Sequence, residues 1–215
     1  MALILYYHPL ASFCWKVLVA LHENATPFEG RIVDLSVPES RAELDRIWTV
    51  GKFPVLRDTA TGAAVPESSI IIEYLDRHFP GGVRLVPNDA ELAREARLWD
   101  RFFDQYVHQP MQKIVTDKLR PEGSHDPFGV EEARKTIRTA YGMIEERIGE
   151  RGWFVGDALS IVECAAAPSL YYANRVEPLG GAYPRVSAYL ERLMSRPSMK
   201  RVMEEAGPYF VNFPG

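Results

Sequence analysis

The sequence has few cysteines and no excess of positive charge. It contains only two cysteines, Cys14 and Cys164, which are far apart and form neither a CxxC pair nor a metal-ligand spacing. This usage favours a reducing cytoplasm as the location, and we expect no metal. Lysine and arginine total 25 against 29 acidic residues, a net charge of −4. The chain therefore lacks the basic field of a nucleic-acid-binding protein, and we expect no nucleic-acid partner.

Long apolar runs are also missing. No segment approaches the roughly 20 apolar residues that cross a bilayer, so we expect no membrane partner. The apolar start at residues 1–7 lacks the basic residues and the small-residue cleavage site of a signal peptide. At 215 residues the chain is long enough for one large or two small domains.

The first part of the chain alternates between strand-like and helical patterns. Apolar runs and turn residues predict strands at 3–7, 31–34, 53–57 and 63–65, and helices at about 12–24, 38–47 and from 68 onward. After residue 90 the pattern is helical throughout, with helices expected at 90–118, 131–149, 160–176, 183–195 and 198–206. We therefore predict an α/β domain at 1–82, a linker at 83–89 and an all-α domain at 90–215.

Two motifs inside the first domain point to a binding site. Phe53-Pro54-Val55-Leu56 places a proline in a strand-like run, which predicts an edge strand entered through a fixed bend, with a cis bond as one option. Glu67 and Ser68 precede an apolar helical run, where free backbone N–H groups favour anions. Together the motifs could bind an extended peptide by its backbone at Phe53 and a terminal carboxylate at Ser68.

In order and spacing, these motifs resemble the thioredoxin-like domain of soluble glutathione transferases, and the resemblance continues through the helical half. Ser160 and Glu163 match the capping box that this family places before a central helix. The pattern is closest to the zeta class. The resemblance implies an enzyme that stabilises the thiolate of its co-substrate glutathione and adds it to a small hydrophobic electrophile, by conjugation or by isomerisation through a reversible adduct.

The resemblance also assigns the glutathione contacts. Ser68 would hold the γ-glutamyl carboxylate and Glu67 the neighbouring ammonium, while Phe53, before the family's cis-proline at Pro54, would pair its backbone with the cysteinyl unit. Lys52 would meet the glycine carboxylate. Each pairing is complementary in charge. The alternatives are a solvated surface lysine at Lys52 and an ordinary helix cap at Glu67 and Ser68.

The segment between the first strand and the first helix should carry the chemistry. Aligned with the zeta-class pattern Ser-Ser-Cys-Ser-Trp-Arg-Val, the family's serine generally taken as catalytic falls on Ala11, and the next serine falls on Ser12. Three accounts follow. Ser12 supplies the hydrogen bond to the thiolate; or Cys14 forms a mixed disulfide with glutathione; or backbone N–H groups and the helix end act without a side chain.

A second-substrate pocket is expected between this segment and the first helix of the second domain. The resemblance places Leu10, His108 and Met111 there. His108 could orient a polar substrate or could serve packing or capping. Three further residues could line the pocket or belong to the core: Tyr106, Ile114 and Tyr172.

The fold alone also permits a non-catalytic glutathione-binding or protein-interaction module, an alternative that Ala11 favours. The family implies a homodimer through the third helix and the first helices of the second domain, here about 70–77 and 92–103. An apolar stripe at helical spacing supports that interface: Leu92, Ala96, Trp99 and Phe103. The aromatic tail at 209–213 is expected to pack back on the body.

Overall fold

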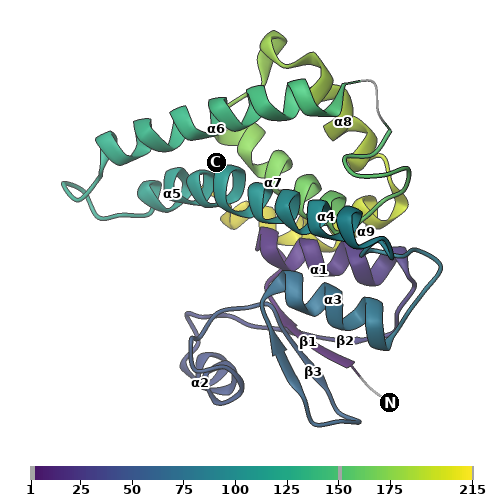
Figure 1. Ribbon diagram of the computed structural model, residues 1–215. Coiled ribbons are helices and arrows are strands. Elements are labelled where there is room, and N and C mark those ends of the chain that lie inside the picture. The colour runs from purple at the N-terminus through teal and green to yellow at the C-terminus, as the bar shows by residue number, and fades with distance from the viewer. Residues whose placement is uncertain (1–2, 150–151, 215) are drawn as a thin grey trace.

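The computed structural model describes residues 3–149 and 152–214. Strands and helices alternate in the amino-terminal part, whereas the described residues from 90 onward contain helices and no strand (Figure 1). The first part consists of β1 (Leu3–Tyr7), α1 (Ser12–Glu23), β2 (Glu29–Ile32), α2 (Pro38–Ile47), β3 (Val55–Asp58), β4 (Ala64–Pro66) and α3 (Ser68–His78). This arrangement confirms the expected fold class, an α/β thioredoxin-like part joined to an all-α part.

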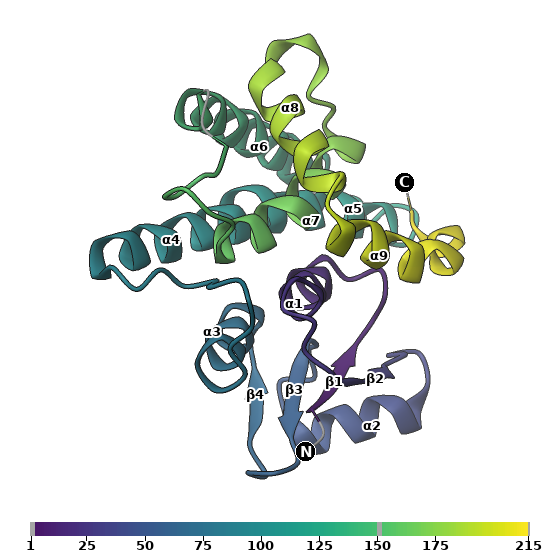
Figure 2. The same ribbon diagram turned by 90° about the vertical axis from the view of Figure 1, so that its right-hand side faces the viewer.

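The four strands form one mixed sheet in the order β2-β1-β3-β4. β1 runs parallel to β2 and antiparallel to β3, and β3 runs antiparallel to β4. Helices α1 and α3 lie between the sheet and the helical half, and α2 covers the opposite face (Figure 2). Under α2 a small apolar cluster of Tyr6, Val33, Leu44 and Val55 fills the space.

The expectation of an edge strand at Pro54 is wrong. β3 pairs on both sides, and the edge position belongs to β4, where Pro66 lies opposite Val55. Pro54 is tolerated because it precedes Val55, the first residue of the strand, so its missing N–H falls outside the ladder. The Phe53–Pro54 bond is cis, as the sequence allowed.

The helical half contains α4 (Ala90–Phe102), the π-helical segment η1 (Phe103–His108), α5 (Gln109–Lys118), α6 (Pro127–Ile148), α7 (Ile161–Val176), α8 (Pro184–Met194) and α9 (Pro197–Ala206), with 3-10 segments η2 (Gly180–Ala182) and η3 (Gly207–Asn212). Helix α7 is buried almost all round at the centre of this half. Its start carries the predicted capping box, in which the Glu163 carboxylate accepts from the Ser160 N–H at 2.8 Å.

The expected helix at 90–118 is interrupted by η1. Pro110 has no N–H to donate back along the helix, and the preceding turn widens to the π form. Such widened turns change the direction in which side chains project and are frequent at functional sites. Here η1 carries Asp104 and His108, and both contact α1.

Two further element boundaries differ from the expectation. The second strand lies at Glu29–Ile32, ahead of 31–34, because it pairs there with β1. Helix α6 begins at Pro127, not at 131, because Asp126 caps it by accepting from the Gly129 N–H at 2.8 Å.

The expected apolar stripe is divided between the core and the surface. Ala96 on α4 and Phe103 at the start of η1 are fully buried in the core of the same chain, whereas Leu92 is 37% exposed. Ala96 and Phe103 therefore do not contribute to an interface between two chains. The aromatic tail does pack back as expected, with Phe210 and Phe213 against the main core. None of the helices in the described ranges has the length and apolar character needed to cross a membrane.

Candidate functional site

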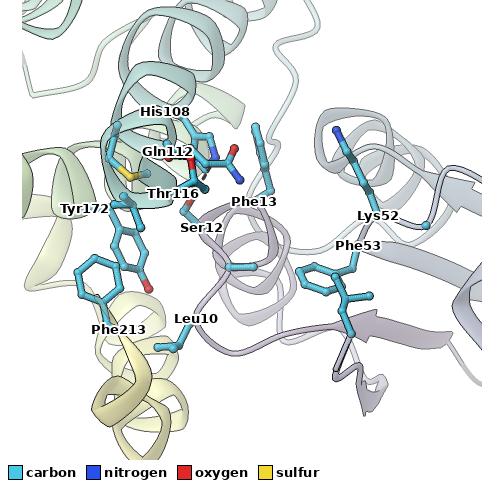
Figure 3. A pocket seen from close by; sticks show the side chains of 15 residues that line it. Leu10, Ser12, Phe13, Lys52, Phe53, His108, Gln112, Thr116, Tyr172 and Phe213 are labelled. Atoms are coloured by element: carbon cyan, nitrogen blue, oxygen red, sulfur yellow. Dashed lines mark hydrogen bonds between the residues drawn. The ribbon is translucent and has the colours of Figure 1, made fainter. Parts of the chain in front are cut away.

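Two adjoining cavities lie where α1 begins, between the sheet part and the helical half. One has a volume of about 390 Å³ and is shown in Figure 3; the other has about 190 Å³. Their linings share Phe13, Lys52 and Phe53. A ligand in the smaller cavity would therefore reach the mouth of the larger one.

The smaller cavity is polar, and it brings together every residue predicted to bind glutathione. Lys52, Phe53, Pro54, Glu67 and Ser68 all line it. The helical half adds side chains that the sequence did not single out: Arg101, Asp104, Gln105 and Gln109. The lining thus offers two cations and two carboxylates, a mixture that suits a zwitterionic peptide.

Glu67 stands at the start of α3 in a strained conformation. Its φ of 70° lies in the left-handed region, which a residue other than glycine adopts at a cost of about 1–3 kcal/mol. Its side chain makes no capping hydrogen bond and is exposed. The geometry therefore disfavours an ordinary helix cap and leaves the carboxylate and the end of α3 to a ligand.

The N-cap residue of α1 also provides no capping side chain. Ala11 occupies the N-cap position and offers no oxygen to the first-turn N–H groups. Ala11 lines the larger cavity and brings no hydroxyl to it. Ser12, the next residue, is 6% exposed and lines the larger cavity.

The Ser12 hydroxyl contacts His108 from η1, with 2.5 Å between Oγ and Nδ1. His108 is buried, and burial, followed by the positive charge of Lys16, lowers its pKa to about 3. The neutral ring has one N–H, so either Ser12 donates to His108 or His108 donates to Ser12. Only the second arrangement leaves the Ser12 proton for a thiolate.

We expect this buried histidine to make stability depend on pH. The folded-state pKa of about 3 lies below the ordinary 6.5, so between these values the unfolded chain takes up a proton that the folded chain does not. The free energy of unfolding should therefore fall as the pH drops below 6.5, by about 2 kcal/mol at pH 5.

Urea unfolding at pH 7 and pH 5 measures this slope. His108→Gln should reduce it, and the remaining slope should come from His8 and His22, whose pKa values burial also lowers. His125, with a 47% exposed side chain, provides the control His125→Gln. Equal slopes in wild type and His108→Gln would contradict the assignment of the pH dependence to His108.

Cys14 does not face the cavity as a nucleophile would. It is fully buried, and this burial raises the pKa of its thiol to about 12. The thiolate needed for a mixed disulfide is therefore scarce at neutral pH. The structure supports the interpretation of Cys14 as a packing residue.

A buried charge cluster that the sequence analysis missed lies behind the polar cavity. The Lys16 ammonium is 2.6 Å from an Asp100 carboxylate oxygen and 2.8 Å from one of Asp104, and it donates to Ser69 Oγ at 2.9 Å. Ser69 in turn donates to Asp100. Burial is the largest influence on the Asp104 carboxyl and raises its pKa, although the positive charge of Lys16 opposes this shift. The sequence feature that could have indicated this cluster is Lys16, a lysine within the apolar run of α1.

The larger cavity is mostly apolar and contains the predicted second-substrate residues Leu10, His108 and Met111. Tyr172 lines it as well. Tyr106 and Ile114 do not: Tyr106 is 50% exposed on another surface, and Ile114 is buried in the core. Sequence analysis did not find four lining residues, which come from three segments: Leu35 from the loop after β2, Val115 and Thr116 from α5, and Phe213 from the carboxy-terminal tail.

Comparison with known proteins decides the family. Residues 5–82 match the glutathione S-transferase N-terminal domain, and residues 111–197 match the glutathione S-transferase C-terminal domain. A glutathione S-transferase-like protein from Fusarium is 30% identical over 164 residues, which cover 74% of this chain and 72% of that relative. The chain belongs to the glutathione transferase family.

Other members of the family resemble this glutathione transferase over most of its length. A probable maleylacetoacetate isomerase from Caenorhabditis elegans is 27% identical, covering 91% of this chain and 90% of the relative. A crystal structure of a glutathione S-transferase from Methylobacillus flagellatus with glutathione bound is 25% identical, with a TM-score of 0.85, and covers 94% of this chain and 98% of that one. Within the described residues, no group of three or more potential ligand side chains is placed to hold a metal ion.

Proposed function

We propose that this glutathione transferase binds glutathione in the polar cavity and adds its thiolate to a small hydrophobic electrophile in the apolar cavity. The observation that carries the proposal is the wall shared by the two cavities at Phe13, Lys52 and Phe53. A tripeptide held in the first would place its central thiol at the entrance to the second. The glutathione-bound structure from Methylobacillus flagellatus supports this use of the fold.

Each end of glutathione has a complementary partner in this arrangement. The γ-glutamyl carboxylate meets Ser68 and the end of α3, and its ammonium meets Glu67. The cysteinyl unit pairs with the Phe53 backbone, and the glycine carboxylate meets Lys52. Charge-assisted hydrogen bonds of this kind are about twice as strong as neutral ones. They hold the thiol at the start of α1, whose free N–H groups and positive end favour the thiolate.

The thiolate then attacks the electrophile, and Ser12 supplies a hydrogen bond to the sulfur. Both a stable conjugate and an isomerisation through a reversible adduct fit this chemistry. The relative named as a probable maleylacetoacetate isomerase supports the second outcome at 27% identity. We place the protein in the cytoplasm, in keeping with two free cysteines.

The proposal predicts that Ser12→Ala slows conjugation. Loss of a hydrogen bond to a charged sulfur should reduce kcat/KM with a test electrophile by about 10- to 100-fold. Ser187→Ala, a serine on α8 remote from both cavities, is the matched control. Cys14→Ala distinguishes the mixed-disulfide account, because only that account predicts complete loss of thiol transfer.

The competing function is a glutathione binder without catalysis, and Ala11 and the Ser12–His108 hydrogen bond favour it. In that case glutathione binds to the wild type, but the conjugation rate equals the uncatalysed rate. If instead the wild type is active and both Ser12→Ala and Cys14→Ala keep its rate, the backbone and the helix end act alone.

We also propose a homodimer, formed through exposed apolar side chains and not through the buried residues Ala96 and Phe103. Large apolar side chains are exposed on α3, α4, η1 and α6: Ile70, Leu98, Tyr106 and Met143. A depression of about 460 Å³, lined by Phe102, Tyr106 and Met143 among others, lies between η1 and α6. Tyr106 and Met143 lie together in this depression, and apolar groups that are exposed together are typical of protein interfaces.

Sedimentation equilibrium at micromolar concentration should give the mass of two chains. Tyr106→Glu should shift this mass to that of one chain, whereas Phe128→Glu, an exposed apolar residue at the start of α6 outside the depression, should leave the mass unchanged. A wild-type monomer would contradict the homodimer.

A further inference from the structure

A further depression lies on the face of the sheet that α2 covers. Its volume of about 420 Å³ is within the range of about 300–1,000 Å³ that is usual for small-molecule sites. Each of the four strands contributes a lining residue, and the second half of α2 forms the remaining wall with the turn before β4. Among the residues that the structure describes, none lines both this depression and one of the two cavities beside α1, so a ligand here would be separate from glutathione.

The pairing of the strands directs two arginines to this face. Tyr6 of β1 lies opposite Arg31 of β2 and opposite Val55 of β3, and residues opposite each other point to the same side of a sheet. Arg57 is two positions after Val55 on β3 and therefore points to that side as well. Since Tyr6 and Val55 pack under α2, this side is the α2 face. The last turn of α2 adds Arg46 to the lining.

The three arginines differ in their partners. The Arg31 guanidinium is 2.7 Å from a carboxylate oxygen of Glu43, which balances its charge. Arg46 donates from Nε to the Ala42 carbonyl at 3.1 Å, but within residues 3–149 and 152–214 it has no carboxylate partner. Over the same residues, the Arg57 side chain makes neither a hydrogen bond nor an ion pair. Two positive charges therefore line the depression without an anion to balance them.

The charges of Arg46 and Arg57 match those of a phosphate monoester. Its phosphate group carries a charge of about −1.5 to −2 at pH 7 and has three oxygens that accept hydrogen bonds. A guanidinium group donates two parallel hydrogen bonds to such oxygens, so one phosphate can pair with both arginines, whereas a carboxylate has one charge and two oxygens. Small and apolar residues form another part of the wall and leave room for an organic group: Ile47, Gly62 and Ala64.

The net charge of the chain decides between a small and an extended anion. At −4, the molecule as a whole repels a nucleic acid or an anionic membrane. We therefore propose that the depression binds a small organic phosphate monoester, whose phosphate group is held by Arg46 and Arg57. The inference goes beyond the proposed function and does not rest on it, because it concerns a separate part of the sheet.

Calorimetric titration with adenosine monophosphate (AMP) at low salt tests the assignment. The wild type should show saturable binding. Arg46→Gln and Arg57→Gln should each weaken it by about 3- to 10-fold, since hydrogen bonds to a charged group are lost at an exposed site. The double variant should lose about 10- to 100-fold, because the two contacts are made by different side chains. No binding to the wild type, or undiminished affinity in the double variant, would overturn the proposal.

A variant with the same change in net charge provides the control. Arg41→Gln combined with Arg185→Gln removes two exposed arginines that do not line the depression. This variant should keep the affinity of the wild type for AMP. If it loses as much affinity as the Arg46 and Arg57 variant, the binding depends on overall charge, and the assignment to the depression is wrong.

Two further probes separate the phosphate from the organic group. Adenosine lacks the phosphate and should bind at least about 10-fold more weakly than AMP. Inorganic phosphate should compete with AMP but bind more weakly, because it makes no contact with the apolar wall. Adenosine that binds as tightly as AMP would overturn recognition of the phosphate, and inorganic phosphate that binds as tightly as AMP would overturn the assignment to an ester.

Competition with glutathione locates the bound AMP. Saturating glutathione should leave the affinity for AMP unchanged, and the Arg46 and Arg57 double variant should keep the affinity of the wild type for glutathione, because neither arginine lines the cavities beside α1. Displacement of AMP by glutathione would place AMP in the polar cavity and would overturn the proposal. This result does not depend on whether the protein catalyses conjugation, so failure of the proposed function and failure of this inference are distinguishable.

Discussion

Replacing Lys16 by methionine should lower the free energy of unfolding by about 3–5 kcal/mol. The substitution keeps an unbranched side chain but removes the cation from between Asp100 and Asp104, whose carboxylates are buried. Uncompensated buried charge is among the costliest single changes in a protein. Because Lys16 lies on α1 and both carboxylates lie on α4 and η1, the loss should weaken the contact between the sheet part and the helical half.

Urea unfolding at pH 7 measures the effect, and Lys200→Met on the exposed face of α9 is the control. Adding Asp100→Asn and Asp104→Asn to Lys16→Met should recover part of the loss, because the unpaired charges are then gone. If Lys16→Met changes the free energy of unfolding by less than about 1 kcal/mol, the cluster does not stabilise the fold as expected.

Glu67→Ala combined with Ser68→Ala should weaken glutathione binding by about 100-fold or more. Each substitution removes a partner of a charged group on the γ-glutamyl end, and a hydrogen bond to such a group contributes about 1.5–3 kcal/mol. The fold should remain, since neither side chain caps α3. In thermal unfolding, glutathione should protect the wild type and should not protect the double variant.

The start of α2 offers a matched control. Glu39 and Ser40 form another acid–serine pair in a first helical turn, and neither of them lines a cavity. Glu39→Ala with Ser40→Ala should leave the affinity for glutathione unchanged in calorimetry. Undiminished affinity in the Glu67 and Ser68 variant would place the binding site elsewhere.

Local patterns in the sequence predicted most of the fold. Helix α2 was expected at 38–47 and lies there, because Pro38 starts it and apolar residues at helical spacing continue it. The Ser160–Glu163 box and the cis bond before Pro54 also follow from residues close in sequence. The boundaries that moved, at Glu29–Ile32 and Pro127, depend on a pairing strand and on a capping side chain.

Features formed by distant residues could not be predicted in this way. Pro54 indicated an edge strand because sequence does not reveal that β4 pairs outside β3. Lys16 meets its carboxylates across 84 and 88 positions, and Ser12 meets His108 across 96. The interruption at η1, which makes both contacts possible, depends on how α4 and α5 pack on α1.

The same distinction between residues close in sequence and distant residues applies to the candidate site. The residues expected to hold glutathione lie together because the family's motifs occur in order along the chain. Arg101 and Gln109 were missed because they approach the polar cavity from the helical half. The catalytic role of Ser12 stays a prediction, since its hydroxyl has His108 as a partner in the free protein.

Ultraviolet titration of the thiol in bound glutathione tests the central claim most directly. If the start of α1 stabilises the thiolate, the bound thiol should ionise at least one pH unit below the value of about 8.5 for a free cysteine thiol. Ser12→Ala should raise that pKa by roughly one to two units, the equivalent of one hydrogen bond to a charged sulfur. A bound thiol that ionises like free glutathione, in the wild type and in Ser12→Ala alike, would contradict thiolate stabilisation at this site.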